Sequence, residues 1–389
     1  MAALRIAIVA GETSGDALGA ALIEALRALV LDIEFTGVAG PKMRAAGCHA
    51  LLEAEQLSVV GLVEVLPHLP RLLRLRARLA RDIASLRPDA FIGVDYQQFN
   101  LGLALRLKRR GIPTVQYVSP QVWAWRQGRV RTMMRAYDLV LCLLPFEPDF
   151  YSAHALRAQF VGHPLADQIP LVPDRAGARA SLGLGAHETV LALLPGSRAD
   201  EVRRLSEPFI RAALLLAQHR AGLKIIAPMA GPLVRAQFER ALQQRAPRPD
   251  VQVLDGQART ALSAADVALV ASGTATLEAL LCRCPMVVAY RVGALSGLLL
   301  RGLVRLPYFS LPNLLAREPL VPEFSQRAVE PEGLARALEH LLDDAAQRAY
   351  LQRRFELIHE SLRQNGAALA ASAVLQLLRA RSGAEVERE

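Results

Sequence analysis

Short, unbroken runs of apolar residues recur along the chain, and each is followed by a turn or by a stretch with helical spacing. In the first half, such runs predict strands at residues 4–10, 34–40, 88–96, 114–119 and 138–144. In the second half, the same pattern predicts strands at residues 188–195, 223–229, 251–255, 266–271 and 285–290. Strands that are apolar on both faces and alternate with helices are typical of a parallel sheet covered on both sides. The sequence therefore predicts an α/β fold with two doubly wound, Rossmann-like domains.

The two sets of strands are separated by residues 160–180, which are richer in proline, glycine and polar residues and indicate a linker. The end of the chain shows helical spacing and no strand. We expect an N-terminal domain over 1–165, a second domain over 166–345, and C-terminal helices over 346–389 that pack back on the first domain. Doubly wound sheets bind ligands beyond the carboxyl ends of their strands, so we expect the two domains to face a cleft that holds the site.

The composition narrows the class of protein. With 389 residues, of which 52% are hydrophobic and 21% charged, the chain can bury large cores and is not intrinsically disordered. Four cysteines are too few for a secreted disulfide scaffold, so we expect a reducing, cytoplasmic location. The longest apolar runs are shorter than the roughly 18–20 residues of a membrane-spanning helix. The N-terminal run ends at a glycine turn and predicts a first strand rather than a signal peptide.

The formal net charge of +9 predicts a polyanionic partner, such as a nucleotide, a phosphate group, nucleic acid or an anionic membrane surface. Aromatic residues make up only 5% of the chain and do not alternate with basic residues, so we expect no nucleic-acid partner. Leucines and arginines mix in two stretches, residues 57–87 and 294–309. Basic amphipathic helices bind anionic lipid surfaces, but a core-facing helix with a solvated arginine face has the same pattern. Both interpretations remain open from the sequence.

Two polar loops in the first half follow predicted strands. The loop over 11–16 contains two glycines that allow a ligand to approach, with Glu12 and Ser14 beside them. An ordinary helix N-cap by Ser14 or Asp16 explains this loop equally well. Asp95 ends a predicted buried strand and is a candidate general base. Taken alone, a structural carboxylate that caps the next helix is the more common explanation for Asp95.

A third loop, over residues 117–131, contains both tryptophans of the chain, Trp123 and Trp125. Three arginines follow them with no acidic residue between. The pattern fits a binding loop and fits equally well a packed corner with a solvated basic helix face.

In the second half, Gly196, Ser197 and Arg198 lie between a predicted strand and a predicted helix. The glycine permits close approach, the serine donates a hydrogen bond, and the arginine presents a forked cation that suits a phosphate. A capped helix with a surface arginine is the alternative. We favour an anion site, because all three groups suit the same ligand.

Ser272, Gly273 and Thr274 open the helix after another predicted strand, and Glu278 lies one turn further along. Hydroxyls and a glycine at a helix start suit a diphosphate, and a carboxylate on the same face suits ribose hydroxyls. An N-cap with a first-turn acid is the alternative. Asn313, in a polar loop, has amide donors that can reach a phosphate or a sugar.

The sequence lacks the motifs for several other kinds of site. No two histidines lie within five residues of each other, and the cysteines form no pair of pairs, so neither zinc motif is present. The chain has no nucleophile elbow and no phosphate-binding loop of the Walker type. It also has no Asp-x-Asp pair, which argues against a nucleotide-sugar site bridged by Mg²⁺. We therefore expect no metal and no cofactor.

A series of motifs resembles the lipid-A-disaccharide synthase family. The motifs, in this order, are GETSGD (11–16), GVAGPKM (37–43), LSVVGLVEVL (57–66), GVD near FN (93–100), YVSPQVWAWRQGRV (117–130), LPFE (144–147), VGHP (161–164), LLPGSR (193–198), ASGTATLE (271–278), CPMVVAYR (284–291) and SLPNLL (310–315). The resemblance extends from about residue 5 to residue 375. The strings YVSPQVWAWR and SLPNLL are specific, whereas the glycine turns alone are not.

The resemblance implies a metal-independent, inverting glycosyltransferase of the GT-B type. UDP-2,3-diacylglucosamine would donate its sugar to 2,3-diacylglucosamine 1-phosphate, giving the β-1,6-linked disaccharide phosphate and UDP. Such an enzyme would work as a peripheral protein on the cytoplasmic face of the bacterial inner membrane. A homodimer is compatible with the sequence. Phosphate and acyl chains on both substrates would explain the basic charge and the leucine–arginine stretches.

The resemblance also implies roles for the candidate residues. Asp95 would take the proton of the acceptor hydroxyl, Arg198 would neutralise the departing diphosphate, and Asn313 would contact the donor. The remaining donor contacts would be Gly196, Ser197, Ser272, Gly273, Thr274 and Glu278, and the acceptor side would include Glu12, Ser14 and Trp123. One departure from the family pattern follows Asp95, where residues 96–98 read Tyr-Gln-Gln rather than a Pro-Asp-like step. A catalytic carboxylate pair is therefore not expected.

Three alternatives remain from the sequence. Another GT-B enzyme, such as the peptidoglycan glucosaminyltransferase or a UDP-sugar 2-epimerase, would share the nucleotide loops but not YVSPQVWAWR. A two-domain binding protein would close on a ligand without turnover. A nucleic-acid binder would need strongly salt-dependent affinity with a sequence or strand preference.

Overall fold

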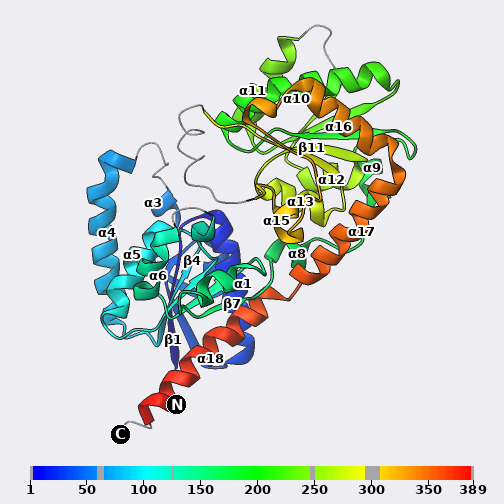
Figure 1. Ribbon diagram of the computed structural model, residues 1–389. Helices are drawn as coiled ribbons and strands as arrows, with labels where there is room; N and C mark the ends of the chain where they lie inside the picture. The colour runs from blue at the N-terminus through cyan, green and yellow to red at the C-terminus, as the bar shows by residue number, and fades with distance from the viewer. Residues whose placement is uncertain (1–2, 59–64, 125–126, 246–249, 294–306, 387–389) are drawn as a thin grey trace. The chain divides into compact units, whose positions relative to one another are not determined.

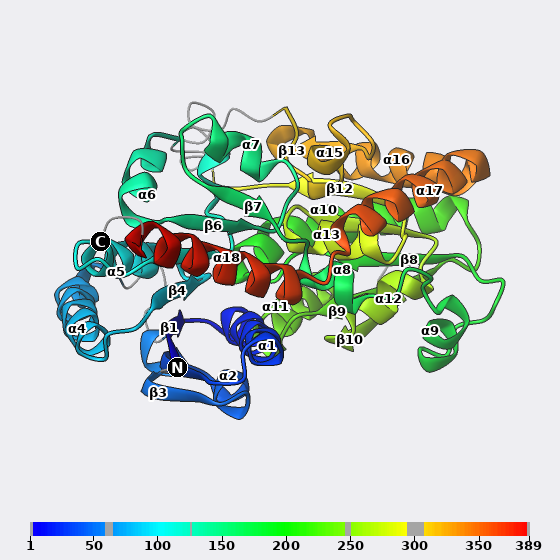
Figure 2. The same cartoon turned by 90° about the horizontal axis from the view of Figure 1, so that it is seen from below.

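A computed structural model describes residues 3–58, 65–124, 127–245, 250–293 and 307–386, with side chains except at 56, 58, 65–70 and 382–386. The chain divides into two compact units. Unit 1 comprises Met1–Asp167 and Leu362–Glu389, and unit 2 comprises Gln168–Ser361. Each unit contains one parallel sheet with helices on its faces (Figures 1 and 2).

Unit 1 contains a seven-stranded sheet in the order β3-β2-β1-β4-β5-β6-β7. Its strands are β1 (Leu4–Ala10), β2 (Ile33–Ala39), β3 (Cys48–Glu53), β4 (Ala90–Val94), β5 (Thr114–Tyr117), β6 (Leu139–Cys142) and β7 (Ala158–Phe160). All neighbours are parallel, and Ile8 on β1 lies between Gly37 on β2 and Ile92 on β4. The strand order reverses beside β1, as in doubly wound sheets, and the carboxyl ends of the strands share one edge.

The side chains of β1 alternate between the two faces of the sheet. Ile6 and Ile8 belong to one core, which α1 and α18 cover. Ala7 and Val9 belong to the other, which α4, α5 and α6 cover (Figures 1 and 2). Strands buried on both faces need apolar residues at every position, which explains the unbroken apolar runs.

The helical segments of unit 1 are α1 (Thr13–Leu29), α2 (Pro41–Ala45), α3 (Glu55–Ser58), α4 (Val65–Ser85), α5 (Gln97–Lys108), η1 (Gln121–Trp123), η2 (Gln127–Arg129), α6 (Val130–Ala136), α7 (Glu147–Ser152), α8 (Pro164–Gln168) and α18 (Gly366–Val386).

Helix α18 comes late in the sequence and belongs to unit 1, where it packs on α1 (Figure 1). The Asp167 carboxylate accepts hydrogen bonds from the backbone N–H groups of Asn365 and Gly366, at 2.9 and 2.8 Å. It thereby caps the start of α18 from a distant part of the chain. The His163 N–H also donates to the Leu362 carbonyl, at 2.9 Å. These bonds hold the returning segment beside the end of the first part of unit 1.

Unit 2 contains a six-stranded parallel sheet in the order β10-β9-β8-β11-β12-β13. Its strands are β8 (Val190–Leu194), β9 (Lys224–Met229), β10 (Val251–Asp255), β11 (Val267–Ala271), β12 (Met286–Tyr290) and β13 (Glu323–Ser325). Its helical segments are α9 (Arg175–Ser181), α10 (Ala199–His219), α11 (Pro232–Gln243), α12 (Ala258–Ala264), α13 (Thr274–Leu281), α15 (Leu311–Ala316), η3 (Gln326–Ala328), α16 (Pro331–Asp343) and α17 (Ala345–Leu362). The order again reverses beside the first strand of the unit.

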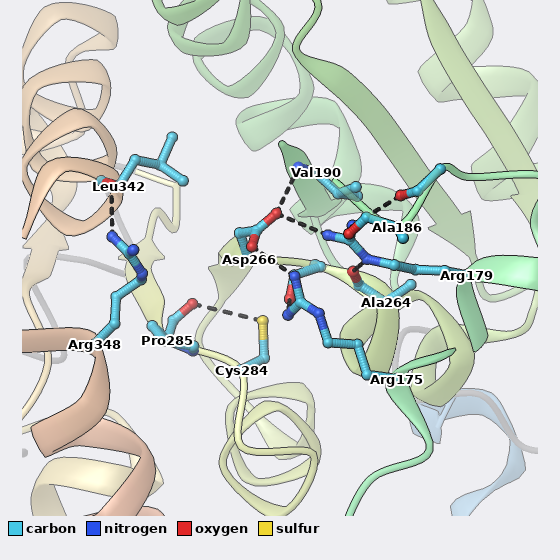
Figure 3. A network of polar contacts seen from close by, with 12 residues as sticks. Arg175, Arg179, Ala186, Val190, Ala264, Asp266, Cys284, Pro285, Leu342 and Arg348 are labelled. Atoms are coloured by element: carbon cyan, nitrogen blue, oxygen red, sulfur yellow. Dashed lines mark hydrogen bonds and ion pairs between the residues drawn. The ribbon is translucent and has the colours of Figure 1, made fainter. Parts of the chain in front are cut away.

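A polar network at the amino ends of β8 and β11 attaches helix α9 to the sheet of unit 2 (Figure 3). Asp266 accepts hydrogen bonds from Arg175 at 2.6 Å, from Arg179 at 3.0 Å and from the Val190 N–H at 2.8 Å. The buried Arg179 guanidinium also donates to the carbonyl of Ala264, at 3.0 Å. Because the buried cation is paired with a carboxylate and with carbonyls, its desolvation is compensated. The network lies at the edge opposite the carboxyl ends of the strands.

The predicted fold is confirmed, and all ten predicted strands are present. Three further strands, β3, β7 and β13, lie at the outer edges of their sheets and were not predicted. They are short or only half-buried, so they lack the continuous apolar run of a central strand. The predicted linker over 160–180 contains the short helices α8 and α9. Helices without a strand close the chain, as predicted.

The leucine–arginine stretch over 57–87 forms α4 from Val65 onward, whereas residues 59–64 lie outside the described residues. Most of the second stretch, 294–306, also lies outside them. Within the described part of α4, four arginine side chains are exposed: Arg71, Arg74, Arg78 and Arg81. Among the described helices, none combines the length and the apolar character needed to cross a bilayer.

Candidate functional site

The predicted site residues lie in loops at the carboxyl ends of the strands in each unit. We call residues 11–16, 95–100, 118–123 and 143–147 the unit 1 edge, because they follow the adjacent strands β1, β4, β5 and β6. We call residues 195–198, 272–276 and 309–313 the unit 2 edge. The first two of these follow β8 and β11, and the third lies before β13.

On the unit 1 edge, the structure brings Ser14 and Asp95 together. The Ser14 hydroxyl donates to Oδ2 of Asp95 at 3.3 Å, although the two residues are 81 positions apart in the sequence. Gly15 lies beside this contact, where a Cβ would make only ordinary van der Waals contacts, 3.4 Å from the Val94 carbonyl oxygen and 3.6 Å from Asp95 Cβ. Glu12 is the N-cap residue of α1, and no side-chain hydrogen bond caps this helix.

The backbone of Asp95 is held in a left-handed conformation, with φ of 49°. Its carbonyl accepts hydrogen bonds from the side-chain amides of Asn100, at 3.0 Å, and Gln116, at 3.1 Å. Burial raises the pKa of the Asp95 carboxyl above its ordinary value, while the hydrogen bond from Ser14 acts in the opposite direction. A carboxyl of raised pKa at a fixed position suits a general base.

Tyr96 explains how this chain accommodates its departure from the family pattern. It is also left-handed, with φ of 35°, and its ring covers the loop after β1. A Cβ on Gly11 would lie 2.5 Å from Cδ1 of Tyr96, so only glycine fits beneath the ring. The Tyr96 hydroxyl donates to the Leu57 carbonyl at 3.2 Å. Burial, and secondarily the charge of Glu12, raise the pKa of Tyr96, which keeps its hydroxyl protonated.

Asp16 has a role that the sequence analysis did not predict. It does not cap its own helix α1; its carboxylate accepts hydrogen bonds from the backbone N–H groups of Gly40, Lys42 and Met43, at 2.9 to 3.0 Å. These groups begin helix α2. Asp16 is therefore a cap for a different helix, 24 or more residues away in sequence. The signal missing from the sequence was the spatial proximity of α1 and α2.

Trp123 lies in the short helix η1 and is 9% exposed. Its indole N–H donates to Oε1 of Glu147 at 3.0 Å, and its ring packs edge-on against Phe146, with centroids 4.9 Å apart. Its acceptor-side role stays a prediction. Trp125 and Arg126 lie outside the described residues.

On the unit 2 edge, Arg198 is the N-cap residue of α10, and its side chain is 81% exposed. Glu201 accepts hydrogen bonds from the backbone N–H groups of Ser197 and Arg198, and its Oε1 lies 3.1 Å from the Arg198 guanidinium. Gly196 has φ of 128°, and a Cβ there would lie 2.7 Å from Glu201. In the predicted phosphate loop, a carboxylate from the first turn of α10 thus occupies the groups that were expected to bind a phosphate.

The second loop of the unit 2 edge begins helix α13. Gly273 has φ of 147°, and a Cβ there would meet nothing within 4 Å. Thr274 is exposed, whereas the Ser272 hydroxyl donates to the Phe309 carbonyl at 2.8 Å. Glu278 pairs with Arg259 at 3.2 Å. This helix start is open to a ligand at Gly273 and Thr274, while Ser272 also links it to the third loop.

Asn313 is buried, and both polar atoms of its side chain are occupied within unit 2. Its amide donates to the Val321 carbonyl at 2.9 Å and to Oε1 of Glu323 at 2.8 Å, and its carbonyl oxygen accepts from the Val321 N–H. Glu323 also accepts from the backbone N–H of Ser310, at 2.9 Å, and of Phe309, at 3.1 Å. In this arrangement Asn313 holds the loop rather than presenting its amide to a ligand.

Sequence reasoning missed two carboxylates that organise these edges, Glu147 in unit 1 and Glu323 in unit 2. Each is the acceptor for several N–H groups, from its own turn and from another loop in the case of Glu147 and from the loop at 309–313 in the case of Glu323. The signal was an acidic residue in an otherwise apolar segment: Glu147 ends the motif LPFE, and Glu323 lies in VPEF. Among the described residues, no three His, Cys, Asp or Glu side chains are grouped as ligands for a metal ion.

Comparison with known proteins gives the family. The family model described as lipid-A-disaccharide synthetase matches residues 6–377. A lipid-A-disaccharide synthase of Sodalis glossinidius is 53% identical over 375 residues, which cover 96% of this chain and 98% of that protein. One of Pseudomonas aeruginosa is 53% identical over 378 residues, covering 97% and 99%.

Solved structures share the fold at low sequence identity. A putative UDP-N-acetylglucosamine 2-epimerase of Listeria monocytogenes has a TM-score of 0.64 at 13% identity, covering 98% of this chain and 97% of that one. The calicheamicin glycosyltransferase has a TM-score of 0.58 at 18% identity, covering 98% and 100%. Anabaena HepE, solved with UDP and glucose, has a TM-score of 0.56 at 13% identity, covering 96% and 99%. With its two parallel-sheet units, its GT-B fold and its full-length relatives, this chain belongs to the lipid-A-disaccharide synthase family of glycosyltransferases.

Proposed function

We propose that the protein transfers the sugar of UDP-2,3-diacylglucosamine to 2,3-diacylglucosamine 1-phosphate, with inversion at the anomeric carbon. The products are the β-1,6-linked disaccharide 1-phosphate and UDP. The observation that carries this proposal is the carboxylate of Asp95, which the neighbouring loops hold at the end of β4 with Ser14 in contact. It is supported by full-length relatives that are named as synthases of this disaccharide.

In the proposed reaction, Asp95 accepts the proton of the acceptor 6-hydroxyl while that oxygen bonds to the anomeric carbon. The bond from that carbon to the UDP oxygen breaks at the same time, and the electron pair leaves with UDP. Inversion follows from a single displacement. The raised pKa of Asp95 makes its carboxylate a stronger base than a solvated one, in keeping with this step.

The departing diphosphate is proposed to bind the unit 2 edge. Gly196, Ser197 and Arg198 directly precede helix α10, and Gly273 caps the start of α13, whose first residue is Thr274. Helix starts supply N–H groups and a positive dipole end, which stabilise negative charge as it develops. At the start of α10, the N–H groups of Ser197 and Arg198 would exchange their present acceptor, Glu201, for the diphosphate. The exposed Arg198 guanidinium can exchange its contact with Glu201 for a phosphate oxygen, and such a charge-assisted bond is strong.

Ser272, Glu278 and Asn313 are proposed to complete the donor site in different ways. Glu278 contacts ribose hydroxyls, in competition with its ion pair to Arg259. Ser272 and Asn313 act on the donor through the loop at 309–313, because their side chains bond to that loop and to Glu323 and Val321. On the acceptor side, Glu12, Ser14 and Trp123 line the approach to Asp95.

The protein is further proposed to work as a peripheral enzyme on the anionic, cytoplasmic face of the inner membrane. Four exposed arginines on α4, at positions 71, 74, 78 and 81, support this proposal. Each arginine near an anionic surface contributes on the order of 1 kcal/mol. Acylated substrates reside in such a surface, so binding it would concentrate them.

The test is UDP release from UDP-2,3-diacylglucosamine, with and without the acylated 1-phosphate acceptor, in detergent containing EDTA. We expect release that depends on the acceptor, survives EDTA and is lost in Asp95→Ala. Equal release without the acceptor would mean hydrolysis. No release with either substrate would overturn the proposal and direct the search to other UDP-sugars.

A further inference from the structure

Glu147 is a buried carboxylate to which the reaction assigns no part. It follows β6 at the start of α7 and is only 3% exposed. Its Oε2 accepts the backbone N–H groups of Leu143 and Leu144, at 3.1 and 3.0 Å. Its Oε1 accepts the indole N–H of Trp123, at 3.0 Å. One oxygen therefore holds the turn that carries Glu147, and the other holds a residue on a different loop.

These three donors and the Ser119 hydroxyl are neutral, and no ion pair to Glu147 occurs among the described residues. Burying a carboxylate without a cation is unfavourable unless hydrogen bonds replace its water. An apolar residue here would leave the three donors without an acceptor, so Glu147 is needed to keep the Trp123 indole and the turn at 143–144 in place.

The segment held by Glu147 leads to the candidate base. Trp123 closes the loop at 118–123, which begins at the carboxyl end of β5. In this loop the Ser119 hydroxyl bonds to the buried Tyr151 hydroxyl at 2.8 Å, and the Ser119 carbonyl accepts from the Gln97 amide at 3.5 Å. Gln97 lies two residues after Asp95. Glu147, the Trp123 loop and the Asp95 loop thus form one continuous series of contacts on the unit 1 edge.

We propose that Glu147 is a positioning residue for the lipid-sugar acceptor: through the Trp123 indole it sets the loop at 118–123 against the Asp95 loop. The proposal rests on the proposed function, in which this edge binds the acceptor. It does not make Glu147 a catalytic residue, because its oxygens are engaged within the protein. It assigns Glu147 to acceptor binding and not to UDP-sugar binding.

The same contact is sensitive to pH. Burial raises the pKa of Glu147 to about 7, and the hydrogen bonds from Leu144, Trp123, Ser119 and Leu143 oppose that rise. Protonation turns one carboxylate oxygen into an O–H donor and makes it a weaker acceptor for an N–H group.

Two other titratable groups face Glu147, Cys142 on β6 and Tyr151 on α7. Burial raises the pKa of both groups above the range in which they could ionise near neutrality. Glu147 is therefore the group in this described cluster that changes charge around pH 7, and we expect its hold on Trp123 to weaken below that pH.

The activity test compares Glu147→Gln with Thr114→Val. Glutamine has one acceptor oxygen for three donors, and its amide N–H groups oppose the indole N–H. We expect KM for the acylated acceptor to rise about tenfold or more, while KM for UDP-2,3-diacylglucosamine stays within about twofold.

Thr114 is the matched control, because it is equally buried on β5 but at the opposite end of the strand, where its hydroxyl donates to the Ala136 carbonyl. Thr114→Val should lower the melting temperature by about 2–4 °C and leave both KM values unchanged. If Glu147→Gln does not fold, Trp123→Phe removes the same indole bond and should raise the acceptor KM alone.

A second measurement needs no turnover. In a Trp125→Phe background, Trp123 is the single tryptophan, and its emission should shift with a midpoint near pH 7. The shift should persist with Thr114→Val and vanish with Glu147→Gln. A pH-independent emission in the parent, or equal rises of both KM values in Glu147→Gln, would overturn the proposal. If the wild type shows no acceptor-dependent turnover but the emission titrates as described, the proposed reaction fails while the Glu147–Trp123 contact stands.

Discussion

The two edges use different residues wherever the backbone turns into the left-handed region. On the unit 1 edge, these residues carry side chains: Asp95, Tyr96 and Val118 have φ of 49°, 35° and 75°. On the unit 2 edge, the corresponding turns use Gly196 and Gly273, with φ of 128° and 147°. Glycine adopts such angles freely, whereas a β-branched valine does so at a cost of about 1–3 kcal/mol.

The contrast corresponds to the two tasks that we propose. A proton acceptor must sit at a fixed point, so unit 1 uses side chains and holds their strained backbone with amides such as those of Asn100 and Gln116. A diphosphate is bound by backbone N–H groups, so unit 2 uses glycines that let the ligand approach closely. Strained, non-glycine residues therefore occur at the edge that positions a catalytic side chain, and glycines occur at the edge that binds the diphosphate.

Replacing the candidate base tests the unit 1 side of this contrast most strongly. Asp95→Asn should lower kcat by about 10²–10⁴-fold with little change in stability, because the amide keeps the shape but cannot accept the proton. Asp89→Asn is the matched control: Asp89 accepts the Arg5 N–H at the amino end of the same strand, and its replacement should leave kcat unchanged. Near-normal turnover in Asp95→Asn would remove the assignment.

The raised pKa of Glu147 predicts that the free energy of unfolding decreases as pH rises, which is the cost of burying this positioning residue in unit 1. The folded protein binds the Glu147 proton more tightly than the unfolded chain does, so this group's contribution falls as pH rises from about 4.5 through about 7. Relative to Glu147→Gln, the wild type should lose about 3 kcal/mol of unfolding free energy over that range. Urea denaturation of both proteins at pH 5 and pH 8 measures this loss. If the free energy of unfolding changed equally with pH in the two proteins, the prediction would be contradicted.

The unit 2 side is tested at Gly273. A Cβ there meets open space in the free protein but would occupy the approach to the start of α13. Gly273→Ala should raise KM for the UDP-sugar by about 10–100-fold, the equivalent of losing 1–3 kcal/mol of hydrogen bonding. Gly256, with φ of 65°, is an equally open glycine after β10, so Gly256→Ala tests an added Cβ on another loop of the same sheet without the binding loss. The difference in backbone cost between the two variants is read from their stabilities, and the KM comparison is made on folded protein. An unchanged KM in Gly273→Ala would place the diphosphate elsewhere.

The network at the opposite end of the unit 2 sheet should affect folding alone. Asp266→Asn keeps one acceptor for Arg175, Arg179 and the Val190 N–H, and we expect it to lower stability by about 1–3 kcal/mol. Neither KM should change, since the network lies at the amino ends of the strands. Thermal unfolding together with steady-state kinetics would separate the two quantities, and a changed KM would show that the two ends of the sheet are coupled.

The sequence predicted the fold because central strands buried on both faces leave an unmistakable apolar run. It predicted the positions of Asp95 and the glycine loops because functional residues of doubly wound sheets follow the strands. It could not show that Asp16 caps α2 or that Glu147 holds Trp123, since each contact joins residues more than 20 positions apart. The burial of Asn313 was hidden for a different reason: Val321 and Glu323 are only 8 and 10 positions away, but they reach it only after the chain has turned back.

The return of α18 to unit 1 has a consequence for synthesis of the chain on the ribosome. Unit 2 lies in one continuous segment, so all of its residues have emerged before unit 1 is complete. Until residues 362–386 follow, one face of the unit 1 sheet lacks the buried Ala370, Ala373 and Val374 of α18, and Asp167 has no helix to cap. The nascent first half therefore carries an apolar surface that α1 covers only in part until the end of translation, and transiently exposed surface of this kind makes a chain prone to aggregate.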